Sequence, residues 1–314
     1  MAEGTGAQGM GVDGIGVDGI VDAHHHLWDL SVRDQDWITG ERLAPLRRDF
    51  SLDDLEPEAK AAGVTATVLV QTVTVAAETP EFLALAAGSD LVAGVVGWTD
   101  LTDPAVADRL AALRELPGGE RLVGIRHQVQ GEPDPQWLLR PDVLRGLRAV
   151  ADAGLVYDLV VLAAQLPAAA RAAGLVPELV FVLDHLGKPP IAAGATRPWS
   201  EDVRALAARP NTVCKLSGMV TEADWDTWTT ADLAPYAATV LDAFGPGRLM
   251  FGSDWPVCRL AASYAEVVDT ARALTAGLGR AEQREVFSGT AGRVYGLRPS
   301  ARTAPGKRST PPTP

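Results

Sequence analysis

The chain has 314 residues, of which 47% are hydrophobic and 22% charged, an ordinary balance for a folded domain. Its formal net charge of −12 repels phosphate backbones and anionic lipid surfaces, which argues against nucleic-acid and membrane partners. The two cysteines, Cys214 and Cys258, have no zinc-type spacing, so a cysteine metal site is not expected, and the low count suits a reducing compartment.

Both ends of the chain have biased compositions. Residues 1–18 are rich in glycine and predict a flexible leader, while residues 299–314 are rich in Pro, Ser, Thr and basic residues and predict a disordered tail. Residues 19–298 contain no linker and predict one folded domain. We find no apolar run of membrane-spanning length and no signal-peptide pattern, so we expect a cytoplasmic protein.

Short apolar runs recur along the folded region. Val, Leu and Ile fill both alternating positions of these runs, which is typical of strands buried on both faces of a parallel sheet. We predict eight strands, at residues 19–24, 65–71, 91–97, 122–127, 155–160, 179–184, 212–216 and 248–253.

Helical segments are predicted between the strands. Several begin near Pro or Asp, and several end at a glycine, namely Gly63, Gly154 and Gly174. The helices expected are 53–62, 104–114, 141–153, 167–173, 202–208 and 231–244, with 263–276 and 281–286 after the last strand. Eight alternations over about 280 residues predict a (β/α)8 barrel of the TIM type. The rival is a doubly wound open sheet, but the first strand is not followed by a Gly-rich phosphate fingerprint.

Polar residues gather at the predicted carboxyl ends of the strands, where (β/α)8 enzymes carry their active sites. All five histidines of the chain belong to this set. In chain order the set comprises His24, His25, His26, Gln71, Arg126, His127, Asp158, Asp184, His185, Lys188, Lys215, Ser217 and Asp254.

The pair His24 and His26 places two imidazoles on one side of an extended chain. They can converge on one metal ion or on one substrate oxygen, and the alternative is a polar strand end that faces water. Asp254, at the end of the last strand, can bind a metal, orient a water molecule and take its proton. The alternative for Asp254 is a helix cap.

Arg126 and His127 end the fourth strand, and because neighbouring strand residues face opposite ways, we expect one of the two in the site. The Arg126 guanidinium suits a carboxylate or a lactone carbonyl, or else an internal ion pair. At the sixth strand His185 is the expected contact, with Asp184 as a partner that orients it. Lys188 either reaches an anionic group or is solvated.

Two tryptophans flank the polar set. Trp28 and Trp255 either wall a ring-shaped substrate or pack in the core. The loop of residues 31–49, which carries Trp37, is expected to cover the site and to help choose the substrate.

Five runs resemble, in this order, the amidohydrolase-related (amidohydrolase 2) family, and within it the sugar lactonases of the L-fuconolactonase and L-rhamnonolactonase kind, which are related to pyrone-dicarboxylate lactonase. The runs are VDAHHHLWDL, VGIRHQVQG, FVLDHLGKP, CKLSGM and MFGSDWPV, and the resemblance covers residues 21–297. It implies a distorted barrel hydrolase that opens a lactone ring with water. The positions that match the family motifs are His24, His26, Arg126, His185 and Asp254.

On this resemblance Asp254 is the expected general base, and after taking up the proton it is also the expected acid for the leaving hydroxyl. His24, His26, Arg126 and His185 are expected to stabilise the oxyanion. Contacts to the substrate are expected from Trp28, His127, Lys188 and Trp255.

The sequence leaves two possibilities open for the cofactor. One divalent ion, zinc or manganese, is held by His24, His26 and Asp254, with or without His185, or catalysis proceeds without a metal. The fourth strand has no lysine to bridge two ions, so a binuclear centre is not expected.

The competing functions are a decarboxylase or amide hydrolase on the same barrel, and a non-catalytic protein that binds a sugar acid. Decarboxylases of this superfamily use a fifth-strand histidine, which this chain lacks. A small-molecule substrate is expected, and the sequence leaves open which lactone it is and which oligomer the protein forms.

Overall fold

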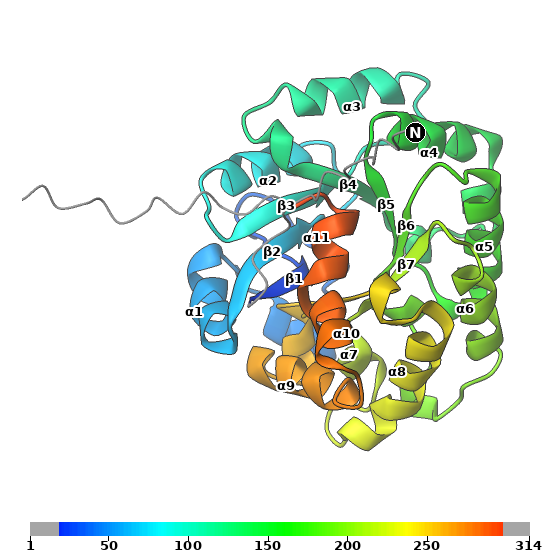
Figure 1. The fold of residues 1–314 in the computed structure, drawn as a ribbon. Coiled ribbons are helices and arrows are strands. Elements are labelled where there is room, and N and C mark those ends of the chain that lie inside the picture. Colours follow the sequence, from blue (N-terminus) through cyan, green and yellow to red (C-terminus); the bar gives the residue numbers. More distant parts are fainter. Residues whose placement is uncertain (1–18, 298–314) are drawn as a thin grey trace, which may run out of the picture.

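The computed structural model describes residues 19–297, so the predicted leader and tail lie outside the described residues. Eight parallel strands follow one another around a barrel in chain order, with helices on the outside (Figure 1). The strands are β1 Ile20–His25, β2 Val64–Val70, β3 Val92–Gly97, β4 Leu122–His127, β5 Val156–Leu159, β6 Phe181–Leu183, β7 Thr212–Leu216 and β8 Leu249–Phe251.

The barrel is nearly closed between its first and last strands. The His26 amide donates to the Trp255 carbonyl at 2.7 Å, and the Asp254 amide donates to the His24 carbonyl at 2.8 Å. These two bonds join the carboxyl end of β1 to the segment that follows β8. The predicted (β/α)8 barrel is therefore confirmed, and its closure lies directly beneath the polar strand ends.

Eleven α-helices occur in the described part of the chain: α1 Leu52–Ala62, α2 Glu78–Ala87, α3 Val106–Arg114, α4 Pro141–Asp152, α5 Leu166–Leu175, α6 Trp199–Ala207, α7 Met219–Glu222, α8 Thr230–Phe244, α9 Tyr264–Leu274, α10 Arg280–Arg284 and α11 Thr290–Val294. Local signals explain several boundaries. Ser51 and Asp54 form a capping box at the start of α1, and Gly63 ends that helix with a left-handed φ of 82°.

Two details of the helix predictions were wrong. Gly174 was expected to end a helix, but α5 continues through it to Leu175, because its backbone is not left-handed and the Arg209 guanidinium packs against it. Helices α2, α7 and α11 were absent from the predicted set, and the sequence of α2 contains Pro80, which resembles a turn signal. Proline is tolerated in the first turn of a helix, where its missing N–H has no helical partner.

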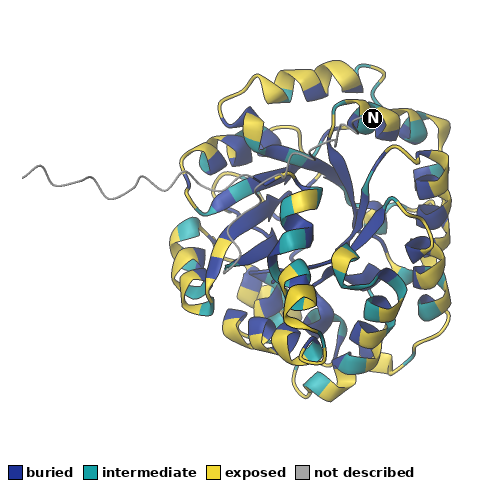
Figure 2. Cartoon of the chain, viewed as in Figure 1, coloured by how far each residue is buried: buried dark blue, intermediate teal, exposed yellow. Residues whose placement is uncertain are grey.

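The core has two layers. Small and β-branched residues fill the inside of the barrel together with the C-terminal residues Tyr295 and Leu297, which come from the segment around α11. Larger apolar side chains pack between the strands and the surrounding helices. Figure 2 shows the buried strands at the centre and the exposed outer faces of the helices. Within residues 19–297, no helix combines the length and the apolar character needed to cross a membrane.

Candidate active site

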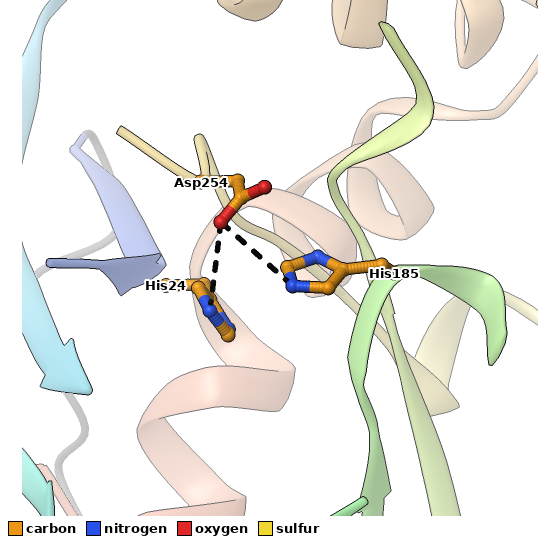
Figure 3. Close-up of side chains that lie close together, drawn as sticks. All are labelled: His24, His185 and Asp254. Carbon is orange, nitrogen blue, oxygen red and sulfur yellow. Dashed lines mark ion pairs between the residues drawn. The ribbon is translucent and has the colours of Figure 1, made fainter. Parts of the chain in front are cut away.

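Three imidazoles surround the Asp254 carboxylate at the carboxyl end of the barrel. Asp254 Oδ1 lies 3.5 Å from His26 Nε2, 3.7 Å from His185 Nε2 and 3.8 Å from His24 Nε2. Figure 3 shows His24 and His185 reaching Asp254 from β1 and from the segment after β6. Residues more than 200 positions apart in the chain therefore meet at one point, as the strand-end pattern predicted.

Hydrogen bonds fix how two of these imidazoles face the carboxylate. His26 Nδ1 donates to the Val70 carbonyl at 2.8 Å, so in the neutral ring the Nε2 lone pair faces Asp254. His185 Nδ1 lies 2.9 Å from the Ser217 hydroxyl, which holds that ring by the atom farther from Asp254. Burial lowers the pKa of His185 to about 4, so this ring is neutral at neutral pH.

Two glycines let the backbone approach the imidazoles. Gly218 has φ of 64°, and a Cβ there would lie 2.6 Å from His185 Nδ1. At Gly252 a Cβ would lie 2.8 Å from the His24 Cβ. Any side chain at either position would collide with the site, so the CKLSGM and MFGSDWPV runs need these glycines for steric reasons.

The Asp254 backbone is anchored by Asp22, a residue that the sequence prediction missed. Asp22 accepts hydrogen bonds from the Ser253 amide at 2.8 Å, from the Ser253 hydroxyl at 2.6 Å and from the Tyr264 hydroxyl at 2.9 Å. Asp254 itself has a left-handed φ of 57°. Although burial raises the pKa of the Asp254 carboxyl, the facing imidazoles of His185 and His26 and the Lys188 ammonium hold that pKa below its usual value. The carboxylate is therefore ionised and able to accept a proton.

A buried ion network lies beneath His24. Lys215 Nζ is 2.6 Å from Asp158 Oδ2 and 3.0 Å from Asp184 Oδ1, and Arg126 donates to Asp184 Oδ2 at 2.9 Å. The Lys215 ammonium also lies 3.0 Å from His24 Nδ1, and Asp184 Oδ1 lies 3.3 Å from the same atom. Burial raises the pKa of Asp158 to about 6, whereas the charges of Lys215 and His24 outweigh the opposing effect of burial on Asp184 and hold its pKa low. This network supports His24 from below, away from the opening of the site.

A cavity of about 140 Å³ opens above Asp254. Arg126 also lines the cavity, although its two Nη atoms are bonded to Asp184 and to Gln71. His24 is fully buried and does not line the cavity itself. The lining residues are His26, Trp37, Thr72, Arg126, Gln128, Gln130, Val160, His185, Lys188, Asp254 and Val257.

His127 faces away from this cavity. Its Nδ1 accepts a hydrogen bond from the Trp98 indole at 3.0 Å, and its Nε2 lies 2.7 Å from Glu132. The ring stacks on Trp137 with centroids 4.3 Å apart. Of the two residues that end β4, Arg126 is thus the one that lines the cavity.

Neither of the two flanking tryptophans lines the cavity. Trp28 is buried and donates to the Arg48 carbonyl at 2.7 Å. Trp255 is fully buried and packs edge-on against Phe50 at 5.4 Å. The aromatic wall of the cavity is Trp37, which belongs to the loop expected to cover the site and whose indole donates to Gln35 at 2.9 Å.

The sequence prediction did not include the polar wall of the cavity. Gln128 and Gln130 line it together with Thr72, and Gln128 donates to the Thr72 carbonyl. A signal for Gln128 was present in the sequence, because it follows Arg126 at an interval of two and an extended chain turns such residues to the same side, whereas Gln130 lies in the 3-10 helix of residues 129–131. Thr72 and Val160 come from loops and Val257 from the start of a short 3-10 helix, and none of the three carried such a signal.

Comparisons with known proteins agree on one family. Residues 21–297 match the model of the amidohydrolase family. The chain is 40% identical over 288 residues to an L-fucono-1,5-lactonase of Burkholderia multivorans, covering 88% of this chain and 96% of the relative. It is 36% identical to an L-fucono-1,5-lactonase of Burkholderia ambifaria, covering 89% and 97%.

A solved structure extends this likeness to three dimensions. The crystal structure of an amidohydrolase from Burkholderia multivorans with bound zinc is 40% identical to this chain and superposes with a TM-score of 0.84. The match covers 89% of this chain and 100% of that one.

Proposed function

The chain belongs to the amidohydrolase family, and on that premise we propose that it is a lactonase that opens the ring of an uncharged sugar-acid 1,5-lactone with water. The observation that carries this proposal is the convergence of three imidazoles on the Asp254 carboxylate within 3.8 Å, at the base of one cavity. The two curated L-fucono-1,5-lactonases, matched over nearly their whole lengths, support L-fucono-1,5-lactone as the first substrate to test.

The residues at the base of the cavity fit a single divalent ion. Zinc binds nitrogen and oxygen ligands at about 2.0–2.2 Å, which places the ligand atoms of a tetrahedral site about 3.3 Å apart. The distance is 3.1 Å between His24 Nε2 and His26 Nε2, 3.5 Å between His26 and Asp254, and 3.7 Å between His185 and Asp254. His24, His185 and Asp254 also offer ligand atoms that all lie within 4.8 Å of one another.

The chemistry of the donor set favours zinc over manganese, because three of the four donors are imidazoles. If His24 holds a cation, Asp184 Oδ1 and Lys215 Nζ, which lie 3.3 and 3.0 Å from His24 Nδ1, would fix the orientation of this imidazole as a ligand. When bound, such an ion polarises a carbonyl and lowers the pKa of a water molecule.

Asp254 is the proposed general base. Its carboxylate is ionised, it lines the cavity, and its left-handed backbone is held by the Asp22–Ser253 bonds. A water molecule beside this carboxylate can lose its proton to Asp254 as its oxygen attacks the lactone carbonyl. His26 and His185 line the same cavity as Asp254.

The charges of the cavity favour an uncharged polyhydroxylated ring over a dicarboxylate. Arg126 is committed to Asp184, and Lys188 is balanced by Glu222 at 3.6 Å, so the cavity has no pair of spare cations for two carboxylates. The neutral amides of Gln128 and Gln130 suit hydroxyl groups, and Trp37 offers an apolar face to a ring.

The test is a proton-release assay on a panel of lactones. The panel holds L-fucono-1,5-lactone, other sugar-acid 1,5- and 1,4-lactones and a pyrone dicarboxylate, with spontaneous hydrolysis subtracted. The protein is stripped with a chelator and assayed with and without added zinc or manganese. We expect turnover of a sugar 1,5-lactone, restored best by zinc, and no turnover of the dicarboxylate. Turnover of no sugar lactone under any metal condition contradicts the proposal.

A further inference from the structure

The chain after β6 makes a turn of left-handed backbone. His185, Leu186 and Lys188 have φ values of 52°, 56° and 52°, and Gly187 between them has 70°. For a residue other than glycine this conformation costs on the order of 1–2 kcal/mol. The turn is held by the Lys188 amide, which donates to the His185 carbonyl at 2.8 Å, and by the Trp199 indole, which donates to the Leu186 carbonyl at 2.7 Å. Strain of this kind persists where the surrounding structure enforces it, and it concentrates at functional sites.

The turn brings Lys188 to the site together with His185. The two residues are three apart in a turn closed by an i to i+3 hydrogen bond, a geometry that puts side chains i and i+3 on the same side. Both side chains line the cavity that Asp254 also lines. Lys188 is therefore built into the site by the same strained segment that positions His185.

The Lys188 ammonium keeps hydrogen-bond donors free for a ligand. Among the described residues its one charged partner is Glu222 of α7, at 3.6 Å, and an ammonium has three N–H donors. Other donors of the cavity are engaged: the two Nη atoms of Arg126 bond Asp184 and Gln71, and His26 Nδ1 bonds the Val70 carbonyl.

Lys188 and Asp254 face the same cavity without contact. Their charged groups form no ion pair within 4.0 Å, although both belong to the described part of the chain and both line the cavity. Acid–base opening of an ester uses a base beside the attacking water and a proton donor beside the leaving oxygen. A lactone bound in this cavity therefore meets both the Asp254 carboxylate and the Lys188 ammonium on its lining.

We propose that Lys188 is a catalytic residue that donates a proton to the ring oxygen as the lactone opens, and that Glu222 is a positioning residue that holds the ammonium. This inference rests on the proposed lactonase function. The proposal gives Lys188 the protonation of the leaving oxygen, a step that the sequence analysis assigned to Asp254.

The oxygen of water bonds to the carbonyl carbon while its proton passes to Asp254. The bond between the carbonyl carbon and the ring oxygen then breaks, its electron pair stays on the ring oxygen, and that oxygen takes a proton from Lys188 Nζ. The neutral amine regains a proton through solvent as Asp254 releases the one it took. Lactone and water are consumed, and a hydroxy acid is formed.

The experiment replaces the lysine by cysteine and rebuilds it chemically. In Lys188→Cys, 2-bromoethylamine yields a side chain of lysine length with an ammonium that carries protons. With (2-bromoethyl)trimethylammonium the same length and charge are obtained without a transferable proton. Cys214 and Cys258 are fully buried, and the unmodified protein and the exposed-lysine variant Lys60→Cys receive the same reagents as controls. The rate constant kcat and KM are measured on the lactone that the wild type turns over best, and zinc content and circular dichroism are recorded for each form.

We expect Lys188→Cys to lose at least about 100-fold in kcat, the lower end of what a general acid contributes, with KM changed by less than about threefold. Aminoethylation should restore kcat to within about tenfold of the wild type, and the trimethylammonium form should stay inactive at unchanged zinc content.

Restoration by both reagents assigns Lys188 a role through charge alone and overturns the proposal. Failure of aminoethylation to restore kcat, or a Lys188→Cys variant as fast as the wild type, overturns it as well. A wild type that turns over no lactone removes the proposed function and this inference together, whereas an active wild type with a fast variant removes the inference alone.

Discussion

Replacing Gly218 by alanine should displace the imidazole that faces Asp254. A Cβ at this position would lie 2.6 Å from His185 Nδ1, and ordinary contact begins at 3.4 Å, so the two must separate by about 0.8 Å. The movement breaks or stretches the 2.9 Å contact between His185 and Ser217 that holds the ring. Because a displacement of about 1 Å in an active site costs on the order of 100-fold in rate, we expect Gly218→Ala to lower kcat by about 100-fold.

Gly194 supplies the control for backbone strain. It has the same φ of 64°, but nothing lies within 4 Å of the position its Cβ would take. Alanine at either position should lower the free energy of unfolding by on the order of 1–2 kcal/mol, the cost of a left-handed residue. Urea unfolding measures the stability of both variants, and proton release measures their kcat. If Gly218→Ala turned over substrate within threefold of Gly194→Ala, the imidazole would not depend on this contact, and the reasoning would be refuted.

Three further changes have different expected outcomes. His127→Ala should keep kcat within about threefold, since His127 faces Trp137 and Glu132, and should lose about 1–2 kcal/mol in urea unfolding from the lost hydrogen bond and stacking; a large fall in kcat would place His127 in the site. Lys215→Met leaves Asp158 without its buried cation and Asp184 with Arg126 alone, and it should lower the free energy of unfolding by about 3–5 kcal/mol, so an equally stable variant would contradict the ion network. Zinc at about 100 times its Kd should stabilise the chelator-treated protein by about 2.7 kcal/mol, seen as a rise in Tm, and an unchanged Tm would count against a zinc site.

The barrel could be predicted because its signals are local. Runs of Val, Leu and Ile mark strands buried on both faces, and the count of eight alternations selects the architecture. The strand ends were harder to predict. Strands β6 and β8 end at Leu183 and Phe251, earlier than expected, and left-handed residues follow within three positions. The pattern of apolar residues does not predict that backbone conformation.

That the histidines and Asp254 meet could also be predicted from the strand ends. The buried ion network beneath them could not. The HxH spacing and the last-strand carboxylate identify side chains that a barrel brings together, and the structure brings His24, His26, His185 and Asp254 within contact. The Lys215 network depends on which groups meet across the interior of the barrel, between strands far apart in sequence.

Which tryptophan lines the cavity could not be predicted from the sequence. Trp28 and Trp255 adjoin motif residues in sequence, yet both are buried in the core beside Phe50. The tryptophan that lines the cavity, Trp37, comes from a loop, and the path of a loop depends on tertiary contacts such as its bond to Gln35. Of the two alternatives for Trp28 and Trp255, the structure shows packing in the core.

Turnover of Asp254→Asn on L-fucono-1,5-lactone tests the role of the central carboxylate most directly. Asparagine has nearly the same shape but cannot take the proton of water, so kcat should fall by about 100- to 10,000-fold while circular dichroism stays that of the wild type. A folded Asp254→Asn protein that turns over the lactone at a near-normal rate would contradict the assignment of Asp254 as the base.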